Sequence, residues 1–181
     1  MMKIILMAAV TIDGKIARDE HHFVDWSSKE DKKLFYSTSR RAGVIIVGNN
    51  TYKTFPSRLP GRLHIVLTTN VSDKVNIPGE VEFTARPPAE IVADLERRGY
   101  TEAVLTGGAQ INALFLKANL VDEIWLTVEP HIFGVGLDLF RGVVFDDHPN
   151  LLEVRQLNEG GSVLLRYALK AEGGRRKAES E

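Results

Sequence analysis

Short apolar runs rich in β-branched residues recur along this chain, with amphipathic helical patterns between them. Runs of this kind are typical of strands that are covered on both faces, as in a parallel sheet flanked by helices. We expect strands at Lys3–Val10, Gly43–Val47, His64–Thr68, Val81–Phe83, Ala103–Leu105 and Glu123–Val128. We expect helices at Ser28–Arg40, Pro88–Arg98 and Ala109–Lys117, the last with Ile111, Leu114, Phe115 and Ala118 on one face. The alternation of strands and helices predicts an α/β fold.

The pattern changes near the C-terminus, where two alternating runs flank a turn that contains glycine. The runs Leu151–Leu157 and Ser162–Leu169 predict an antiparallel hairpin. We therefore predict a three-layer fold with a central mixed, mostly parallel sheet and an antiparallel C-terminal hairpin. The 181 residues suffice for a single domain with a substantial core, which we place at residues 1–170. The polar residues 171–181 are expected to form a disordered tail.

Two glycine-containing turns are candidate seats for phosphate groups. In the segment Ala103–Ile111, an apolar run meets Gly107 and Gly108 and a helical pattern then begins. Glycines let a ligand approach the backbone closely, and the N–H groups at a helix start favour a negative charge. A tight strand-to-helix turn without a ligand would look the same. The segment Gly48–Tyr52 follows another strand in the same way, and two such turns suit a ligand with several phosphates.

Composition and missing motifs argue against several other classes of function. The 23 basic and 24 acidic residues give a net charge of −1, without the basic excess of nucleic-acid or membrane-surface binding. Cysteine is absent, which excludes disulfides and thiol catalysis and is compatible with the cytoplasm, where we expect the protein. The five histidines show no metal-ligand spacing, and we expect no metal site. The dinucleotide motif G-x-G-x-x-G and the P-loop motif are also absent.

One carboxylate near the start of the first expected helix is a candidate for chemistry. Ser27 followed by Glu30 has the spacing of a capping box, so the helix should begin there. Asp31 then shares a face with the apolar residues Leu34 and Phe35 and is carried toward the interior. A carboxylate in that position needs a partner, which makes Asp31 a candidate proton donor or anchor for a polar heterocycle. The alternative is a first-turn acid that the helix dipole stabilises.

In combination, these segments resemble the dihydrofolate-reductase-like superfamily, and especially the reductase domain of the riboflavin-biosynthesis deaminase/reductase. The resemblance covers about Lys3 to Leu169 and is carried by Thr11–Ala17, Trp26 with Asp31, Val47–Tyr52, and Thr106–Leu116. The segment Leu59–Arg62 is similar to dihydrofolate reductases. Similarity to the riboflavin branch lies in Ile12–Ala17, Leu120–Trp125 and Pro130–Gly134, and in Asn112, where dihydrofolate reductases usually have tyrosine. We favour the riboflavin branch.

The resemblance implies that NADPH lies across the strand ends. Ala9 and Ile16 would flank the nicotinamide. The pyrophosphate and adenosine groups would be held by Gly48, Asn49, Asn50, Thr51, Thr68, Thr69, Gly107, Gly108, Ala109, Gln110 and Ile111. Dihydrofolate reductases commonly have basic residues at the positions of Asn49, Asn50 and Gln110, where they hold the 2′-phosphate of NADPH. The choice between NADPH and NADH is therefore open, with Lys53 as a substitute cation.

The resemblance also implies a substrate site. Asp31 would bind the substrate and assist its protonation, Ala9 and Phe35 would line the pocket, and Arg62 or Arg58 would hold an anionic group of the substrate. The expected reaction is hydride transfer to a phosphoribosylamino-pyrimidine, which becomes a ribitylamino product. Dihydrofolate reduction is one alternative, and nicotinamide-dinucleotide binding without catalysis is another.

We also expect a homodimer. The strand runs of the C-terminal half, Leu120–Val128 and Leu151–Leu169, are rich in apolar residues, and riboflavin-type reductases are dimers. These runs would form the contact between the two subunits.

Overall fold

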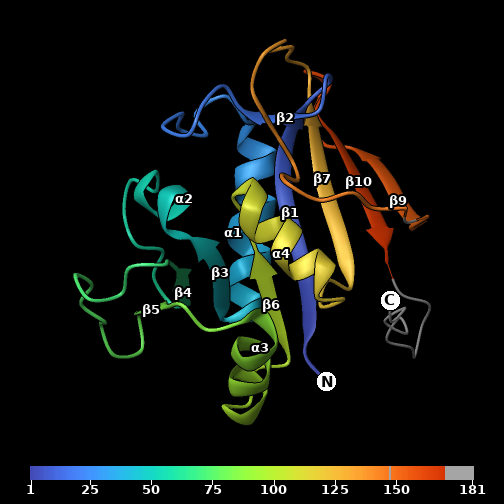
Figure 1. Ribbon diagram of the computed structural model, residues 1–181. Helices are drawn as coiled ribbons and strands as arrows, with labels where there is room; N and C mark the ends of the chain where they lie inside the picture. Colours follow the sequence, from blue (N-terminus) through green and yellow to red (C-terminus); the bar gives the residue numbers. More distant parts are fainter. Residues whose placement is uncertain (147, 170–181) are drawn as a thin grey trace.

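An eight-stranded sheet runs through the middle of the computed structural model, which describes residues 1–146 and 148–169 (Figure 1). The strands are β1 (Lys3–Thr11), β3 (Val44–Gly48), β4 (Leu63–Leu67), β5 (Val81–Thr84), β6 (Glu102–Leu105), β7 (Glu123–Glu129), β9 (Asn150–Gln156) and β10 (Val163–Ala168). Their order in the sheet is β5-β4-β3-β6-β1-β7-β10-β9. The first six are parallel, whereas β10 runs antiparallel to both β7 and β9. The predicted mixed sheet with an antiparallel C-terminal hairpin is confirmed. The predicted tail lies outside the described residues.

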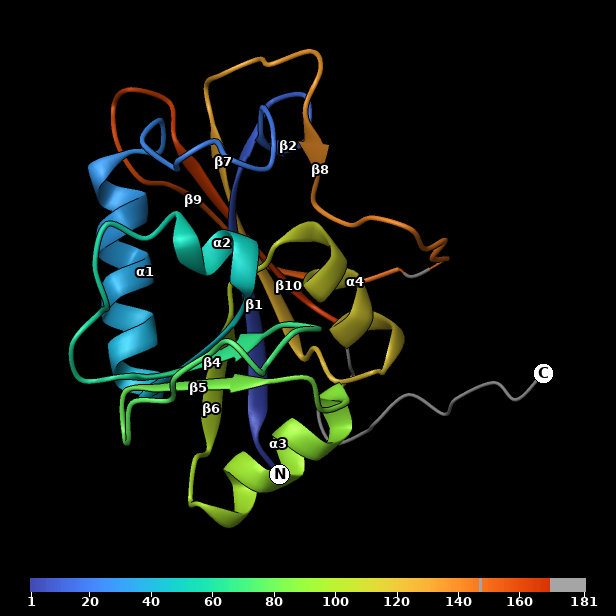
Figure 2. The ribbon, with the colours of Figure 1, turned by 60° about the vertical axis from the view of Figure 1, so that its left-hand side comes forward.

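Helices cover both faces of the sheet and make it the middle layer of three (Figures 1 and 2). On one face, α1 (Lys29–Ala42) packs through Leu34 and Phe35 against Ile5 and Trp125. The other face is covered by α3 (Pro88–Arg97) and α4 (Ala109–Lys117). A short helix, α2 (Asn49–Lys53), follows β3 directly. No helix of the described ranges is long and apolar enough to span a bilayer.

The central strand β1 shows why these runs are apolar on both sides. Ile4 and Leu6 belong to the core on the α3–α4 side, and Ile5 and Met7 belong to the core under α1. All four are almost completely buried. Because successive side chains of a strand point to opposite faces, a strand covered on both faces needs a continuous apolar run.

Two local predictions were wrong. The cap of α1 is Ser28, whose Oγ accepts a hydrogen bond from the Asp31 N–H at 3.2 Å, so the capping box that begins at Ser27 does not form. On α4, Leu114 is exposed, as is Ala118, and the buried side includes Asn112. Asn112 donates from Nδ2 to the Leu139 carbonyl at 3.0 Å. The loop after β7 covers that side of α4, which the helical pattern alone does not reveal.

A second, two-stranded sheet was not predicted. Its strands β2 (Lys15–Ala17) and β8 (Leu137–Asp138) pair antiparallel, and Lys15 Nζ lies 2.5 Å from the Asp138 carboxylate. A Cβ on Gly136 would meet the Ala17 carbonyl oxygen at 2.5 Å, so the close approach of these strands requires glycine there. Strands this short carry no readable hydrophobic alternation.

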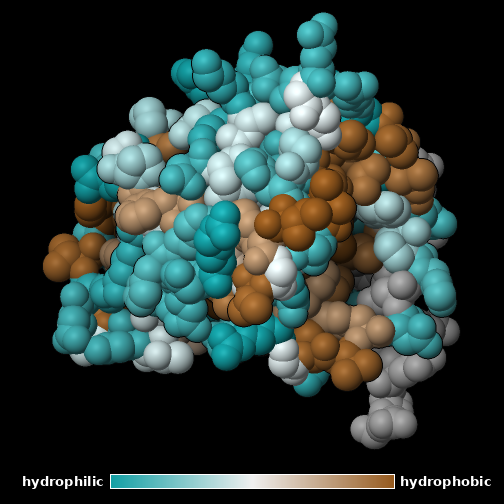
Figure 3. Space-filling view, turned by 90° about the horizontal axis from the view of Figure 1, so that it is seen from above, coloured by the Kyte–Doolittle hydropathy of each residue, from teal (hydrophilic) through white to brown (hydrophobic). Residues whose placement is uncertain are grey.

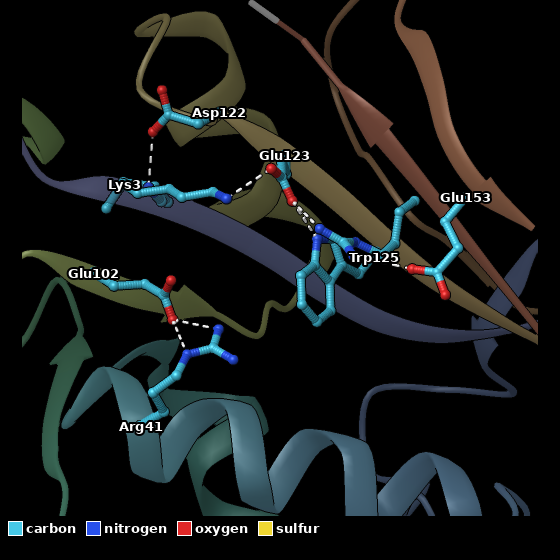
Figure 4. A network of polar contacts seen from close by, with 9 residues as sticks. Lys3, Arg41, Glu102, Asp122, Glu123, Trp125 and Glu153 are labelled. Carbon is cyan, nitrogen blue, oxygen red and sulfur yellow. Dashed lines mark hydrogen bonds and ion pairs between the residues drawn. The ribbon is translucent and has the colours of Figure 1, made fainter. Parts of the chain in front are cut away.

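A network of ions around Glu123 holds the hairpin to the parallel strands (Figure 4). The Glu123 carboxylate forms an ion pair with Lys3 Nζ at 2.6 Å. It also accepts hydrogen bonds from the Trp125 indole N–H at 2.6 Å and from Arg166 Nη2 at 3.2 Å. Burial alone would raise the pKa of Glu123, but these three donors outweigh it and the pKa is lowered. The guanidinium of Arg166 also pairs with Glu153 and lies over the Trp125 ring. Residues from β1, β7, β9 and β10 therefore share one charged cluster.

Candidate active site

A large cleft opens at the carboxyl ends of the parallel strands. Its volume is about 1570 Å³, more than a drug-sized ligand needs and enough for an extended one. The ends of β1, β3, β4, β5 and β6 contribute to its walls, because the carboxyl ends of parallel strands meet at one edge of a sheet. Figure 3 views the molecule from this end, where apolar surface lies between hydrophilic side chains.

The two glycine turns meet in this cleft. Gly48 donates its N–H to the Gly107 carbonyl at 2.6 Å. A Cβ on Gly48 would lie 2.9 Å from Ile111 Cγ1, and a Cβ on Gly108 would lie 3.0 Å from Thr51 Oγ1. Side chains at these positions would push the turns apart. Gly108 is also the N-cap residue of α4 and provides no side-chain cap, so the first N–H groups of this helix are available to an anion.

Most of the predicted site residues line the same cleft. The lining includes Asp31 and Phe35 from α1 and these predicted cofactor residues: Ala9, Ile16, Gly48, Asn49, Asn50, Thr51, Thr68, Thr69, Gly107, Gly108, Ala109, Gln110 and Ile111. The structure thus brings together positions that are spread over about a hundred residues of sequence. Lys53, the proposed substitute cation, is not among the lining residues.

The two predicted substrate arginines lie elsewhere. Arg58 and Arg62 line a separate cavity of about 460 Å³, and neither lines the cleft that holds Asp31. Arg62 is only 7% exposed and donates from Nη2 to the Tyr36 carbonyl at 2.7 Å. Its pKa is lowered, first by burial and then by the nearby Arg40. Arg58 pairs with Glu80, with Nε 3.3 Å from Oε2. The structure therefore does not join these arginines to the acid of the cleft.

Asp31 lies in the first turn of α1 and faces the cleft, where burial raises the pKa of its carboxyl. The hydroxyl groups of Thr127 and Ser27 act in the opposite direction and lower that pKa. The buried Glu129 adds a further rise through its negative charge, and Lys32 lowers the pKa. A carboxyl held in this way retains its proton to a higher pH than a solvated one, which suits an acid or a hydrogen-bond donor.

Several residues near the cleft escaped the sequence analysis. Thr127 and Glu129 follow Trp125 on β7 at intervals of two residues. This spacing places them on the same face as Trp125, which is the face that α1 covers. Four cations, Arg18, Lys32, Arg86 and Arg141, also line the cleft. Arg86 lies two residues after the end of β5, a position whose significance depends on knowing that β5 ends at the cleft.

Comparison with known proteins agrees with this geometry. A family model described as the RibD C-terminal domain matches residues 2–163. The chain belongs to the RibD C-terminal domain family. A 2,5-diamino-6-ribosylamino-4(3H)-pyrimidinone 5′-phosphate reductase from Methanothermobacter thermautotrophicus is 24% identical over 92% of this chain and 98% of its own length. Dihydrofolate reductase type 9 from Escherichia coli is 29% identical over 70% of each chain.

A solved structure has the same fold as this RibD C-terminal domain. It is the diaminohydroxyphosphoribosylaminopyrimidine deaminase/5-amino-6-(5-phosphoribosylamino)uracil reductase of Thermotoga maritima, with a TM-score of 0.78 and 19% identity. The match covers 93% of this chain and 57% of that one. The predicted resemblance to the superfamily and to its riboflavin branch is confirmed. Relatives named as reductases of both branches match the chain.

Proposed function

We propose that this chain is an NADPH-dependent reductase of riboflavin biosynthesis. Its substrate would be a 5-amino-6-(5-phosphoribosylamino)uracil-type or 2,5-diamino-pyrimidinone phosphate, which it reduces to the ribitylamino form. The observation that carries the proposal is one cleft in which two apposed glycine turns and the half-buried carboxyl of Asp31 meet. Membership of the RibD C-terminal domain family supports the choice of substrate.

The residues of the cleft fit a nicotinamide dinucleotide. The uncapped start of α4 and the Gly107–Gly108 turn would receive the pyrophosphate. Ala9 and Ile16 would contact the nicotinamide, which supplies a hydride when bound. Thr68 and Thr69 follow β4 and Arg86 follows the neighbouring β5, so these three would lie at the adenosine end.

Arg86 is our candidate for holding a 2′-phosphate, in place of the basic residues that are absent at Asn49, Asn50 and Gln110. Its Nε donates to Thr84 Oγ1 at 3.2 Å, and its Nη2 lies 3.5 Å from Asp94, which also pairs with Arg97 and Arg98. Because Asp94 already has two other cationic partners, the guanidinium of Arg86 retains capacity for an anion.

Asp31 would act on the substrate. Addition of a hydride to C1′ of the ribosylamino group breaks the bond from C1′ to the ring oxygen, and that oxygen gains one proton. A carboxyl with a raised pKa is suited to supply that proton or to donate a hydrogen bond to the pyrimidine. Phe35, beside it on α1, would pack against the heterocycle.

The second candidate function is reduction of dihydrofolate, because a carboxyl in a cleft also suits a pterin and a dihydrofolate reductase is among the relatives. NADPH oxidation measured separately with the pyrimidine phosphate and with dihydrofolate distinguishes the two. We expect turnover with the pyrimidine phosphate and its loss in Asp31→Asn. Turnover with dihydrofolate alone would replace the first candidate, and cofactor binding without any turnover would favour a non-catalytic binding protein.

The hairpin supports a homodimer as part of the same proposal. The edge strand β9 leaves Leu151, Leu152 and Val154 exposed by 55%, 50% and 60%. An apolar edge strand of this kind favours pairing with another chain. We expect light scattering to give the mass of a dimer at micromolar concentration, and a monomer would contradict this part of the proposal.

A further inference from the structure

Glu129, the last residue of β7, is a buried carboxylate to which neither the sequence motifs nor the proposed reaction assigns a role. It is 2% exposed. Its Oε1 accepts the Ser28 N–H at 2.7 Å, and its Oε2 accepts the Ser162 hydroxyl at 2.5 Å. Burial of a charged carboxylate costs free energy unless hydrogen bonds offset it, so we looked for a function of the two hydrogen bonds that Glu129 accepts.

These hydrogen bonds join three elements behind the cleft. The Oγ of Ser28 caps α1 by accepting a hydrogen bond from the Asp31 N–H, and the N–H of Ser28 donates to Glu129. Glu129 is therefore linked to Asp31 through one residue. Ser162 lies in the turn of the hairpin, where Asn158 Nδ2 donates both to Ser162 Oγ and to Glu30 Oε2 at 3.0 Å. The end of β7, the start of α1 and the hairpin turn are thus held around one carboxylate.

The strand places the same carboxylate near the acid. Thr127 precedes Glu129 by two residues on β7, so both side chains point to the α1 face, and Thr127 acts directly on Asp31. The negative charge of Glu129 disfavours ionisation of Asp31, whereas Lys32 favours it. Asp25, Glu30, Glu159 and His131, which lie near the same three segments, are exposed to solvent, which screens them.

We propose that Glu129 is a positioning residue, which fixes the start of α1 against β7 and so holds the Asp31 carboxyl in the cleft. The inference deepens the proposed function, because it concerns the same acid. It is nevertheless testable without turnover, since the ionisation of Asp31 is a property of the free protein.

The test is a carbon-13 NMR titration of the carboxyl groups, with the Asp31 signal assigned by its loss in Asp31→Asn. In Glu129→Gln, which keeps the size of the side chain and removes its charge, we expect the pKa of Asp31 to fall. Glu159→Gln is the matched control: it removes an exposed carboxylate from the hairpin turn, and the Asp31 titration should not move. An unchanged Asp31 titration in Glu129→Gln, or an equal shift in Glu159→Gln, would overturn the inference.

A second variant keeps the inference testable if Glu129→Gln does not fold. Ser162→Ala removes one of the two donors that hold Glu129, so the start of α1 is less firmly fixed and the pKa of Asp31 should fall toward its ordinary value. A rise, or no change, would contradict the inference.

Turnover separates this inference from the proposed function. If the pyrimidine phosphate is reduced, the acidic limb of the plot of kcat/KM against pH should shift together with the Asp31 titration. An acidic limb that does not shift would count against the inference. A shifted NMR titration without turnover of any substrate would uphold the role of Glu129 and refute the proposed function. Turnover of the pyrimidine phosphate together with an unchanged Asp31 titration would support the proposed function and refute the role of Glu129.

Discussion

Substitution of Gly48 by alanine tests whether the contact between the two glycine turns holds the proposed cofactor site together. The backbone of Gly48, with φ of −76° and ψ of 149°, suits any residue, so alanine brings no backbone strain. The cost comes from its Cβ, which would lie 2.9 Å from Ile111 Cγ1 and 3.5 Å from both the Gly107 carbonyl oxygen and the Gly108 nitrogen. Overpacking of this kind costs about 1–3 kcal/mol, which lowers Tm by roughly 3–9 °C for a chain of this size.

The assay is a double-mutant cycle of Gly48→Ala and Ile111→Ala, with Tm and the Kd of NADP⁺ measured for each variant. Because Ile111→Ala removes the atom that the new Cβ would strike, the second substitution should recover part of the loss caused by the first. The affinity for NADP⁺ should fall in Gly48→Ala and recover in the same way. Strictly additive changes in Tm, or a Gly48→Ala protein as stable as the wild type, would refute the reasoning.

Three further predictions concern the cofactor, the acid and the charged cluster. Arg86→Gln should weaken binding of NADPH roughly tenfold and leave NADH binding unchanged in calorimetry; equal losses for both cofactors would exclude a role in 2′-phosphate binding. Phe35→Ala should raise the KM for the substrate and leave the Kd of NADPH unchanged in fluorescence titration, whereas weaker cofactor binding would contradict its place beside Asp31. Glu123→Gln should cost about 2 kcal/mol of unfolding free energy at pH 7. Since folding lowers the pKa of Glu123, this stabilisation is present above the usual value of 4.5 and is lost as pH falls through the folded value. Urea titrations at pH 7 and pH 3 check this, and an equal difference at both values would contradict it.

The main sheet was predictable because its strands are buried on both faces and therefore form continuous apolar runs, as in β1 and β3. The meeting of the two glycine turns in one cleft was predictable because Gly48, Gly107 and Gly108 mark strand ends, and the carboxyl ends of parallel strands lie at one edge. The order of the strands was not needed for that inference.

Other features depend on contacts between distant segments. The pairing of Lys15 with Asp138 in the small sheet joins residues that no local pattern connects. The family resemblance led us to expect Arg62 near the substrate, but Arg62 donates to the Tyr36 carbonyl and lines another cavity. Glu129 has the sequence surroundings of an ordinary strand-end acid. Its burial follows from the packing of α1 and the hairpin turn, which periodicity within β7 does not reveal.

We propose that the cleft reduces a pyrimidine ribosyl phosphate with NADPH and that Asp31 is its acid. The most direct measurement follows NADPH absorbance with purified protein and 5-amino-6-(5-phosphoribosylamino)uracil, for the wild type and Asp31→Asn in parallel, with product identified by mass spectrometry. We expect a product heavier by two hydrogens with the wild type and loss of most of the activity in Asp31→Asn, with NADPH binding retained. Absence of that product from a wild-type protein that binds NADPH, or full activity in Asp31→Asn, would contradict it.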